Sequence, residues 1–190
     1  MFFNEIKTMK TTLTIFSGLP GTGKSTLARL AVPKLRISLL GIDEIVSSIP
    51  AHMSQHADPY WDDMIGILLK LVESQLELGL SVMVDSVFMG EDRYQANEIA
   101  RRHKAEFRPI YTYLSDERVW EERVRQRVEA APPEIKAMIA TWERLQEQRK
   151  AFYPWKPGSA LFVDGLAPVE TNLTKVLQFV TAPQVELAPL

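Results

Sequence analysis

Short apolar runs alternate along the chain with longer stretches in which apolar residues recur every three or four positions. The short runs have the length and β-branched content of buried strands. They predict strands at residues 12–17, 36–42, 80–85, 106–114 and 160–164. The longer stretches predict helices at residues 23–34, 59–78, 91–103, 116–130, 133–152 and 169–180. Residues 43–58 follow neither pattern clearly.

Several of these boundaries carry end signals of their own. Asp58 and Pro59 are typical of an N-cap followed by proline at the first helical position, and Gly79 is expected to stop that helix. Ser115 is expected to cap the helix over 116–130. The Pro132–Pro133 pair is expected to begin the helix that runs to about residue 152.

The alternation of strands and helices predicts an α/β fold. We expect a mostly parallel five-stranded sheet with helices on both faces, in three α/β/α layers. Sheets of this kind bind ligands beyond the carboxyl ends of their strands, where the loops after residues 17, 42, 85 and 164 would cluster. We expect one domain over residues 11–180, with an N-terminal tail at 1–10 and a frayed tail at 181–190.

The composition narrows the class of protein. Hydrophobic residues make up 46% of the 190 residues and charged residues 24%, which is typical of a globular protein. The net charge of −2 leaves no global basic surface for duplex nucleic acid. The absence of cysteine excludes disulfides, thiolate zinc sites and cysteine nucleophiles. Residues 1–10 contain no long apolar run, so we expect neither a signal peptide nor a membrane span, and a cytoplasmic location.

One segment matches the pattern G-x-x-x-x-G-K-[ST] in full. It reads Gly18, Leu19, Pro20, Gly21, Thr22, Gly23, Lys24 and Ser25. Glycines let consecutive backbone N–H groups approach a phosphate, and the helix that follows points its positive end at the anion. We therefore expect a P-loop that binds ATP, with Lys24 on the β- and γ-phosphates, Ser25 on Mg²⁺ and Thr26 near the α-phosphate.

Two acids follow predicted strands at the same edge of the sheet. Asp43 comes directly after the strand 36–42, where it would orient or deprotonate an acceptor hydroxyl, act as a helix N-cap, or do both. Asp85 ends the run VMVD, which resembles a Walker B strand whose acid holds the Mg²⁺ shell or orients the acceptor. Ser86 beside it is a candidate acceptor contact.

The arginines of the predicted helix 116–130 are unevenly paired. Arg125 has acids at helical spacing, whereas Arg123 and Arg127 have none three or four positions away and face each other. A bound polyphosphate would relieve this repulsion, and so would an acid elsewhere in the fold. We interpret residues 116–135, approximately, as a small helical lid over the phosphates.

These features together resemble the P-loop kinases of the polynucleotide-kinase and zeta-toxin-like branch, which have an AAA-type P-loop domain. The resemblance is carried by GLPGTGKST at 18–26, by GIDEI, by VMVDS and by the E-R-V-R-Q-R lid, and it spans about residues 11–180. It implies a P-loop NTPase fold with a small helical lid, ATP as phosphoryl donor and Mg²⁺ as cofactor. It also implies transfer of the γ-phosphoryl group to a hydroxyl.

The resemblance also suggests individual roles. Asp43 would be the catalytic base, while Asp85 and Ser86 would help to hold the acceptor. Arg123 would lie near the adenine and Arg127 on the phosphates, as a catalytic group beside Lys24.

Two further positions bear on the acceptor. Arg93 occupies a region where relatives place a structural or acceptor-binding arginine. Val46 stands where polynucleotide kinases that grip a neighbouring phosphate carry an arginine. With the net charge, this favours a small-molecule acceptor such as a nucleotide sugar, nucleoside, antibiotic or metabolite. The alternatives are a polynucleotide 5′-hydroxyl kinase and, in another class, a non-catalytic or regulatory ATP-binding protein.

Two other groups of residues have less specific patterns. His52 and His56 stand four positions apart before Asp58, but Pro50 argues against a rigid zinc site, so we expect them to line the acceptor pocket or face solvent. A group of aromatic residues near the end of the helix 133–152 is expected to pack in the core, with acceptor stacking as the alternative. It comprises Trp142, Phe152, Tyr153 and Trp155.

Overall fold

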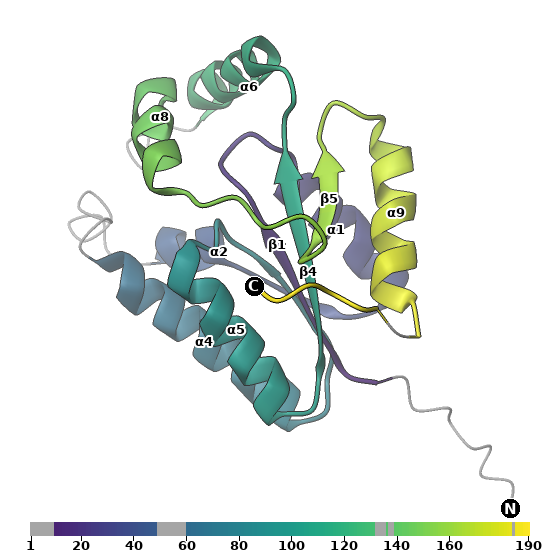
Figure 1. The fold of residues 1–190 in the computed structure, drawn as a ribbon. Helices are drawn as coiled ribbons and strands as arrows, with labels where there is room; N and C mark the ends of the chain where they lie inside the picture. Colours follow the sequence, from purple (N-terminus) through teal and green to yellow (C-terminus); the bar gives the residue numbers. More distant parts are fainter. Residues whose placement is uncertain (1–9, 49–59, 132–135, 137–138, 184) are drawn as a thin grey trace, which may run out of the picture.

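The computed structural model describes residues 10–48, 60–131, 136, 139–183 and 185–190. At its centre is a five-stranded sheet in the order β2-β3-β1-β4-β5 (Figure 1). The strands are β1 (Thr12–Ser17), β2 (Ser38–Gly41), β3 (Val82–Asp85), β4 (Glu106–Tyr113) and β5 (Leu161–Asp164). All four strand pairs are parallel, which confirms the predicted sheet.

Strand β1 lies in the middle of the sheet and is buried on both faces. Leu13 and Ile15 pack into one hydrophobic cluster and Phe16 into another, because successive side chains of a strand point to opposite faces. β1 pairs with β3 on one side and with β4 on the other. The loop after β1 therefore leaves the sheet at the point where such folds form a ligand-binding crevice.

Helices cover both faces of the sheet. Helices α1 (Lys24–Leu35) and α9 (Val169–Thr181) cover one face (Figure 1). Helices α4 (Trp61–Glu77) and α5 (Gly90–Arg102) cover the other, with α2 (Ile42–Ser48) beside α4. This is the three-layer arrangement that the sequence predicts. Within the described residues, no helix is long and apolar enough to cross a membrane.

A pair of helices lies beyond the carboxyl edge of the sheet. They are α6 (Glu117–Ala130) and α8 (Trp142–Ala151), called here the α6–α8 pair (Figure 1). A small hydrophobic cluster joins the pair to the rest of the fold through Leu19, Trp120 and Leu145. Residues 152–160 then return from α8 to β5 and are called here the return segment.

The start of α6 differs from the prediction. Asp116, and not Ser115, is the N-cap, because its carboxylate accepts hydrogen bonds from the N–H groups of Arg118 and Val119. The hydroxyl of Ser115 donates instead to the carboxylate of Asp164 at the end of β5. Both residue types are good caps, so the tertiary partner of Ser115 decided between two neighbouring candidates.

The helix predicted from the Pro132–Pro133 pair is shorter than expected. Helix α8 begins only at Trp142, where the hydroxyl of Thr141 accepts a hydrogen bond from the N–H of Arg144. Residues 139–140 before this cap are described and are not helical. The long continuous helix is therefore wrong, because a capped start interrupts it.

The C-terminal residues are held against the domain. The N–H of Ala188 donates to the carbonyl of Gly158 over 2.9 Å, and Lys156 donates to the carbonyl of Leu190 over 2.9 Å. Leu190 also packs against the hydrophobic cluster beneath α4 and α5. The expectation of a frayed tail is wrong for residues 185–190, because the return segment supplies backbone and apolar partners.

The aromatic group divides between the interior and the surface. Phe152 and Trp155 are buried, as predicted, and Trp142 is half-buried against Trp120. Tyr153 is 72% exposed, so the core prediction is wrong for this residue. His52, His56 and Asp58 lie outside the described residues.

Candidate active site

The loop between β1 and α1 has a backbone that only glycine accommodates at Gly18. The φ angle of Gly18 is +138°, and a Cβ atom there would lie 2.2 Å from the carbonyl oxygen of Thr112 in β4. A side chain at this position would collide with the neighbouring strand. The close approach of the loop to β4 therefore depends on Gly18.

The interior of the loop is held by three hydrogen bonds. The carbonyl of Leu19 accepts from the hydroxyl of Thr22 over 2.8 Å and from the ammonium of Lys24 over 3.1 Å. The hydroxyls of Thr22 and Thr112 lie 2.7 Å apart. Lys24 is only 8% exposed, and this burial lowers the pKa of its ammonium, although the nearby Asp85 opposes the shift.

An oxygen-rich pair lies beside the amino end of α1. Ser25, in the first turn of that helix, donates a hydrogen bond to the carboxylate of Asp85 at the end of β3. Burial raises the pKa of Asp85, while Lys24 and the bond from Ser25 oppose the rise. A hydroxyl and a carboxylate are oxygen ligands of the kind that Mg²⁺ prefers, so these two side chains fit a magnesium site.

One cavity lies along the outer side of the loop and is called here the P-loop cavity. It has a volume of about 500 Å³. Helix α1 begins at its wall, so the positive end of that helix is available to an anion. The lining combines the loop and α1 with the amino end of α2, with α6 and with the segment after β5. It consists of Gly21, Thr22, Gly23, Lys24, Ser25, Thr26, Leu27, Arg29, Asp43, Arg123, Arg127, Gly165, Ala167, Val169 and Asn172.

A second cavity opens between α2, α4 and the end of β3 and is called here the Trp61 cavity. It has a volume of about 210 Å³. Its lining is partly apolar, and the buried hydroxyl of Ser86 has no hydrogen-bond partner among the described residues. The lining residues are Pro20, Lys24, Ser25, Ile42, Asp43, Val46, Ser47, Trp61, Asp85, Ser86, Val87, Arg127, Ile139, Ala140 and Gln148.

The two cavities share one group of side chains. Lys24, Ser25, Asp43 and Arg127 line both of them. The Nη2 atom of Arg127 lies 3.5 Å from the Oδ2 atom of Asp43, which places an arginine of α6 against the first turn of α2. Arg127 therefore has the distant acid that the sequence left as an alternative to a bound polyphosphate.

The other arginines singled out in the sequence occupy different places. Arg123 lines the P-loop cavity and donates to the carbonyl of Gly165 over 3.2 Å. Arg93 lines neither cavity. It is buried between the rings of Phe152 and Trp155, at 5.0 and 4.6 Å from their centroids, and burial lowers its pKa to about 10. The structure thus brings Arg123 to the loop and Arg93 to the return segment.

Sequence reasoning missed a contact between α6 and the loop. The indole N–H of Trp120 donates to the carbonyl of Pro20 over 2.7 Å. It also missed Trp61 and Gln148, which line the Trp61 cavity. An apolar residue in a helix normally signals burial, and nothing in the local pattern distinguishes a tryptophan that also donates to a distant carbonyl.

Comparison with protein families places these residues in context. The model of the AAA domain family matches residues 13–154, which include the loop, both acids and the α6–α8 pair. Comparison with curated proteins finds no match.

Solved structures share the fold at low sequence identity. A presumed kinase from Chloroflexus aurantiacus has a TM-score of 0.72 and 20% identity, covering 90% of this chain and 98% of its own. A gluconokinase from Sinorhizobium meliloti has a TM-score of 0.64 and 16% identity, covering 92% of this chain and 93% of its own. The APS kinase of Mycobacterium tuberculosis, solved with AMPPNP and APS, has a TM-score of 0.63 and 17% identity, covering 90% of this chain and 98% of its own.

Proposed function

The chain belongs to the AAA domain family, and from that premise we propose that it is a P-loop kinase, which transfers the γ-phosphoryl group of ATP to a hydroxyl of a small molecule. The P-loop cavity would take ATP and the Trp61 cavity the acceptor. The observation that carries this proposal is the group of side chains shared by the two cavities, Lys24, Ser25, Asp43 and Arg127. A kinase must bring donor and acceptor together over one such group.

Three of the four shared side chains would act directly on the transfer. Lys24 and Arg127 would neutralise charge on the phosphoryl oxygens as it spreads in the transition state. Asp43 would orient the acceptor hydroxyl and receive its proton. The acceptor oxygen forms a bond to the γ-phosphorus, the bond to the oxygen that bridges the β- and γ-phosphates breaks, and ADP leaves. Because Asp43 lines both cavities, its carboxylate is available at the point where they meet.

The ion pair between Asp43 and Arg127 supports this division of roles. In the structure each group neutralises the other across 3.5 Å. Donor phosphates would compete for Arg127 and leave the Asp43 carboxylate open to the acceptor hydroxyl. Both side chains are more than one third exposed, so separating them costs little free energy.

The residues at the loop also fit a divalent cation. Ser25 and Asp85 supply a hydroxyl and a carboxylate that already contact each other. A bound Mg²⁺ would supply charge neutralisation on the β- and γ-phosphates.

The Trp61 cavity favours a small acceptor. Its volume of about 210 Å³ is less than half that of the P-loop cavity. The unpartnered hydroxyl of Ser86 offers a hydrogen bond to a polar acceptor group, while Trp61 and Val46 offer apolar contact. Val46 also leaves that position without a cation for a second phosphate. Gluconokinase and APS kinase, which share the fold, are named for small-molecule substrates.

The test is a measurement of acceptor-stimulated ADP release with ATP and Mg²⁺. The acceptor panel would contain sugars, nucleosides, nucleotide sugars, aminoglycosides and oligonucleotides with 5′-hydroxyl ends. We expect stimulation by a small-molecule class. Stimulation by oligonucleotides alone would favour the polynucleotide kinase, and ATP binding without stimulation by any class would favour a regulatory ATP-binding protein.

Two variants separate the donor side from the acceptor side. Lys24→Ala should weaken binding of AMPPNP and abolish ADP release. Asp43→Asn should leave AMPPNP affinity within about threefold while lowering transfer by about 10²–10⁴-fold, the usual contribution of a positioned acid or base. Wild-type turnover in Asp43→Asn would show that Asp43 is not the base.

A further inference from the structure

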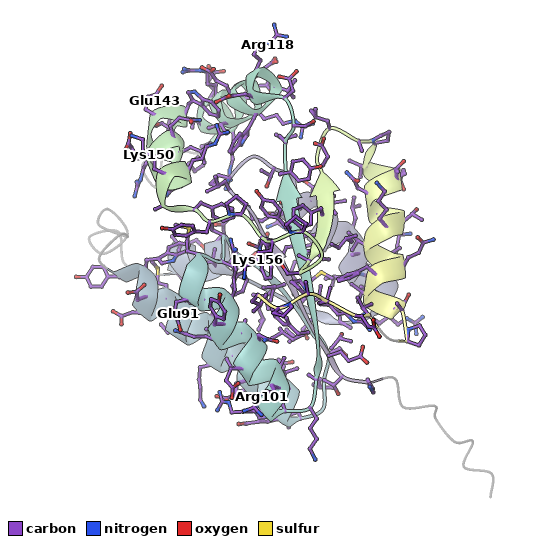
Figure 2. The ribbon with its side chains drawn as sticks, in the orientation of Figure 1. Glu91, Arg101, Arg118, Glu143, Lys150 and Lys156 are labelled. Carbon is purple, nitrogen blue, oxygen red and sulfur yellow. The ribbon has the colours of Figure 1, made fainter. Side chains whose placement is uncertain are left out.

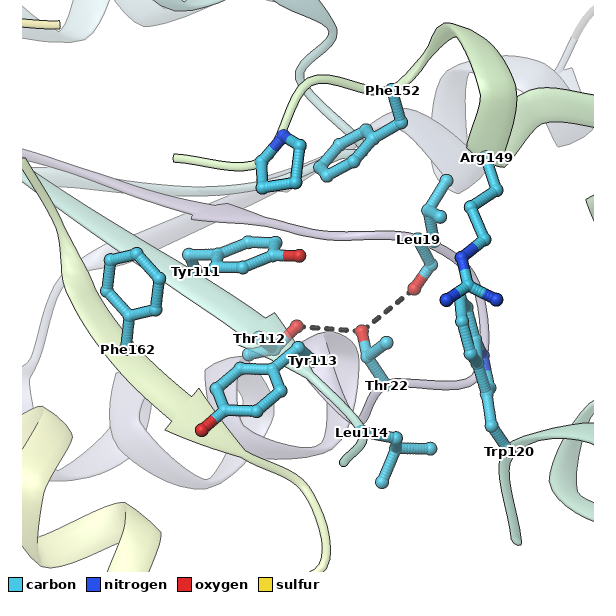
Figure 3. A pocket seen from close by; sticks show the side chains of 11 residues that line it. Leu19, Thr22, Tyr111, Thr112, Tyr113, Leu114, Trp120, Arg149, Phe152 and Phe162 are labelled. Carbon is cyan, nitrogen blue, oxygen red and sulfur yellow. Dashed lines mark hydrogen bonds between the residues drawn. The ribbon is translucent and has the colours of Figure 1, made fainter. Parts of the chain in front are cut away.

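A third cavity lies behind the P-loop, beneath the α6–α8 pair, and is called here the Tyr111 cavity (Figure 3). Its volume of about 490 Å³ equals that of the P-loop cavity within a few per cent and falls in the range of small-molecule sites. Its walls come from the ends of β4 and β5, from the return segment, and from the α6–α8 pair. None of the four side chains shared by the other two cavities lines it.

One wall of the Tyr111 cavity is a row of aromatic rings. The ring of Tyr111 stacks with those of Tyr113 and Phe152, each at 5.9 Å between centroids and 22° between planes. Phe162 meets Tyr111 edge-on at 5.2 Å. Stacked faces and edges of this kind favour a flat ring as the occupant, because such a ring gains contact area and quadrupole complementarity.

The opposite wall carries the only charged side chain of the lining. The Arg149 guanidinium lies over the ring of Trp120, 5.4 Å from its centroid (Figure 3), and it also pairs with Glu117 over 2.9 Å. Arg149 and Glu117 are 48% and 62% exposed, so an anion in the cavity could compete for the guanidinium. A planar guanidinium suits the planar or bidentate oxygens of a carboxylate, sulfonate or phosphate.

A second polar group faces the cavity without a partner. The Tyr111 hydroxyl points toward the side of Leu19 and Thr22 in Figure 3, and among the described residues no hydrogen bond reaches it. Burial raises the pKa of that hydroxyl, so it remains a donor over the physiological range. A hydroxyl without a partner at the wall of a cavity favours a ligand that accepts a hydrogen bond.

We propose that the Tyr111 cavity is a second ligand site, which binds a planar aromatic ring bearing an anionic group, with the ring against Tyr111 and Phe152 and the anion on Arg149. This site is separate from the P-loop and Trp61 cavities. It does not depend on phosphoryl transfer. It touches the P-loop from the rear, because Leu19 and Thr22 line it, and the Leu19 carbonyl also holds Lys24.

The test uses 8-anilinonaphthalene-1-sulfonate, a flat aromatic anion, and the neutral N-phenyl-1-naphthylamine as its uncharged counterpart. Binding of each probe is titrated by fluorescence to the full chain in the presence of saturating AMPPNP and Mg²⁺. We expect the sulfonate to bind at one saturable site, and Arg149→Gln to weaken it by about tenfold, the effect of losing one charge-assisted hydrogen bond. The neutral probe should bind Arg149→Gln and wild type within about twofold.

A second variant separates recognition from structural damage. Glu117→Gln also breaks the ion pair with Arg149, but it leaves the guanidinium free. This variant should therefore bind the sulfonate more tightly than wild type, and not more weakly. If the ion pair had only a structural role, Glu117→Gln and Arg149→Gln would change the affinity for the sulfonate in the same direction. Arg118→Gln removes a neighbouring charge that points away from the body of the protein (Figure 2) and should leave both probes unchanged.

Either of two outcomes would overturn the proposal. One is sulfonate binding that is present in the protein without nucleotide and is lost at saturating AMPPNP, which would make the Tyr111 cavity part of the nucleotide site. The other is equal sulfonate affinity in wild type and Arg149→Gln, which would place the probe elsewhere on the surface.

Discussion

The Nη2 atom of Arg127 lies 3.5 Å from the Oδ2 atom of Asp43 and joins helix α6 to the first turn of helix α2. The two residues stand 84 positions apart in the sequence. Their side chains are 44% and 66% exposed, a range in which ion pairs stabilise a fold by about 0–1 kcal/mol. The contact therefore matters more for the site than for stability.

The first prediction concerns this contact between Arg127 and Asp43, which should affect catalysis much more than stability. Arg127→Gln should change the free energy of unfolding by less than about 1 kcal/mol, because the pair is exposed. It should lower phosphoryl transfer by about 10²–10³-fold, because one charge that stabilises the transition state is lost. Urea unfolding and steady-state ADP release measure the two effects. Arg125→Gln, which breaks a pair with Glu121 elsewhere on α6, is the control and should leave transfer within about twofold.

The second prediction concerns the contact of α6 with the P-loop. Trp120→Phe keeps an aromatic ring but removes the hydrogen bond to the Pro20 carbonyl, so it should destabilise the protein by about 1–2 kcal/mol. Trp142→Phe keeps the edge contact with Trp120, and its indole N–H has no hydrogen bond within the described residues. Trp142→Phe should therefore lose less than half as much free energy of unfolding as Trp120→Phe. Equal losses of stability in the two variants would contradict the importance of the hydrogen bond to the Pro20 carbonyl.

The third prediction compares two glycines. Gly18→Ala forces a side chain into a backbone with φ +138° and within 2.2 Å of the Thr112 carbonyl, so we expect a loss of more than about 2 kcal/mol. Gly66→Ala lies in helix α4 with no atom within 4 Å of the added methyl, so it should stabilise by about 0.5–1 kcal/mol. Thermal unfolding of both variants checks the contrast. If the two substitutions changed the stability by similar amounts, the loop could move away from β4 at little cost in free energy.

The fourth prediction concerns pH. Burial raises the pKa of Asp85 in the folded protein, so the fold holds this proton more tightly than the unfolded chain does. The stability that Asp85 contributes is therefore present below the ordinary carboxyl range and is lost as pH rises through the folded pKa. The difference in unfolding free energy between wild type and Asp85→Asn should fall as pH rises above about 4.

Asp164, at the end of β5, is a control for this prediction because its pKa is shifted in the opposite direction. Burial acts to raise the pKa of Asp164, but hydrogen bonds from Ser115 and Leu166 outweigh it and lower that pKa. The stability contributed by Asp164 is present above the ordinary carboxyl range and is lost as pH falls through the folded pKa. The difference between wild type and Asp164→Asn should therefore grow as pH rises, and the same slope for both aspartates would refute the assignment.

The parallel sheet and the loop were predictable because their signals are local. The strand 12–17 has the bounds expected from its apolar run, and the glycine pattern at 18–25 specifies a backbone that few other sequences allow. The residue at which helix α6 begins was harder to predict. Ser115 and Asp116 are equally good caps, and only the carboxylate of Asp164, 49 positions from Ser115, separated them.

The site as a whole needed the fold. Asp43 was expected at the sheet edge from its place after a strand, but its contact with Arg127 depends on how α6 lies over α2. Arg93, expected to be a structural or an acceptor-binding arginine, is buried against Phe152 and Trp155 and lines neither the P-loop cavity nor the Trp61 cavity. A charged residue in a helix gives no local sign that aromatic rings from a distant segment will cover it.

The amino-acid sequence by itself determined the phosphate-binding loop and the alternating strands and helices, because glycine stereochemistry and hydrophobic periodicity act over a few neighbouring residues. The tertiary structure alone decided that Trp120 reaches Pro20, 100 positions away, and that three cavities surround the loop. Such contacts arise where separate elements meet, and their geometry follows from how the helices pack on the sheet.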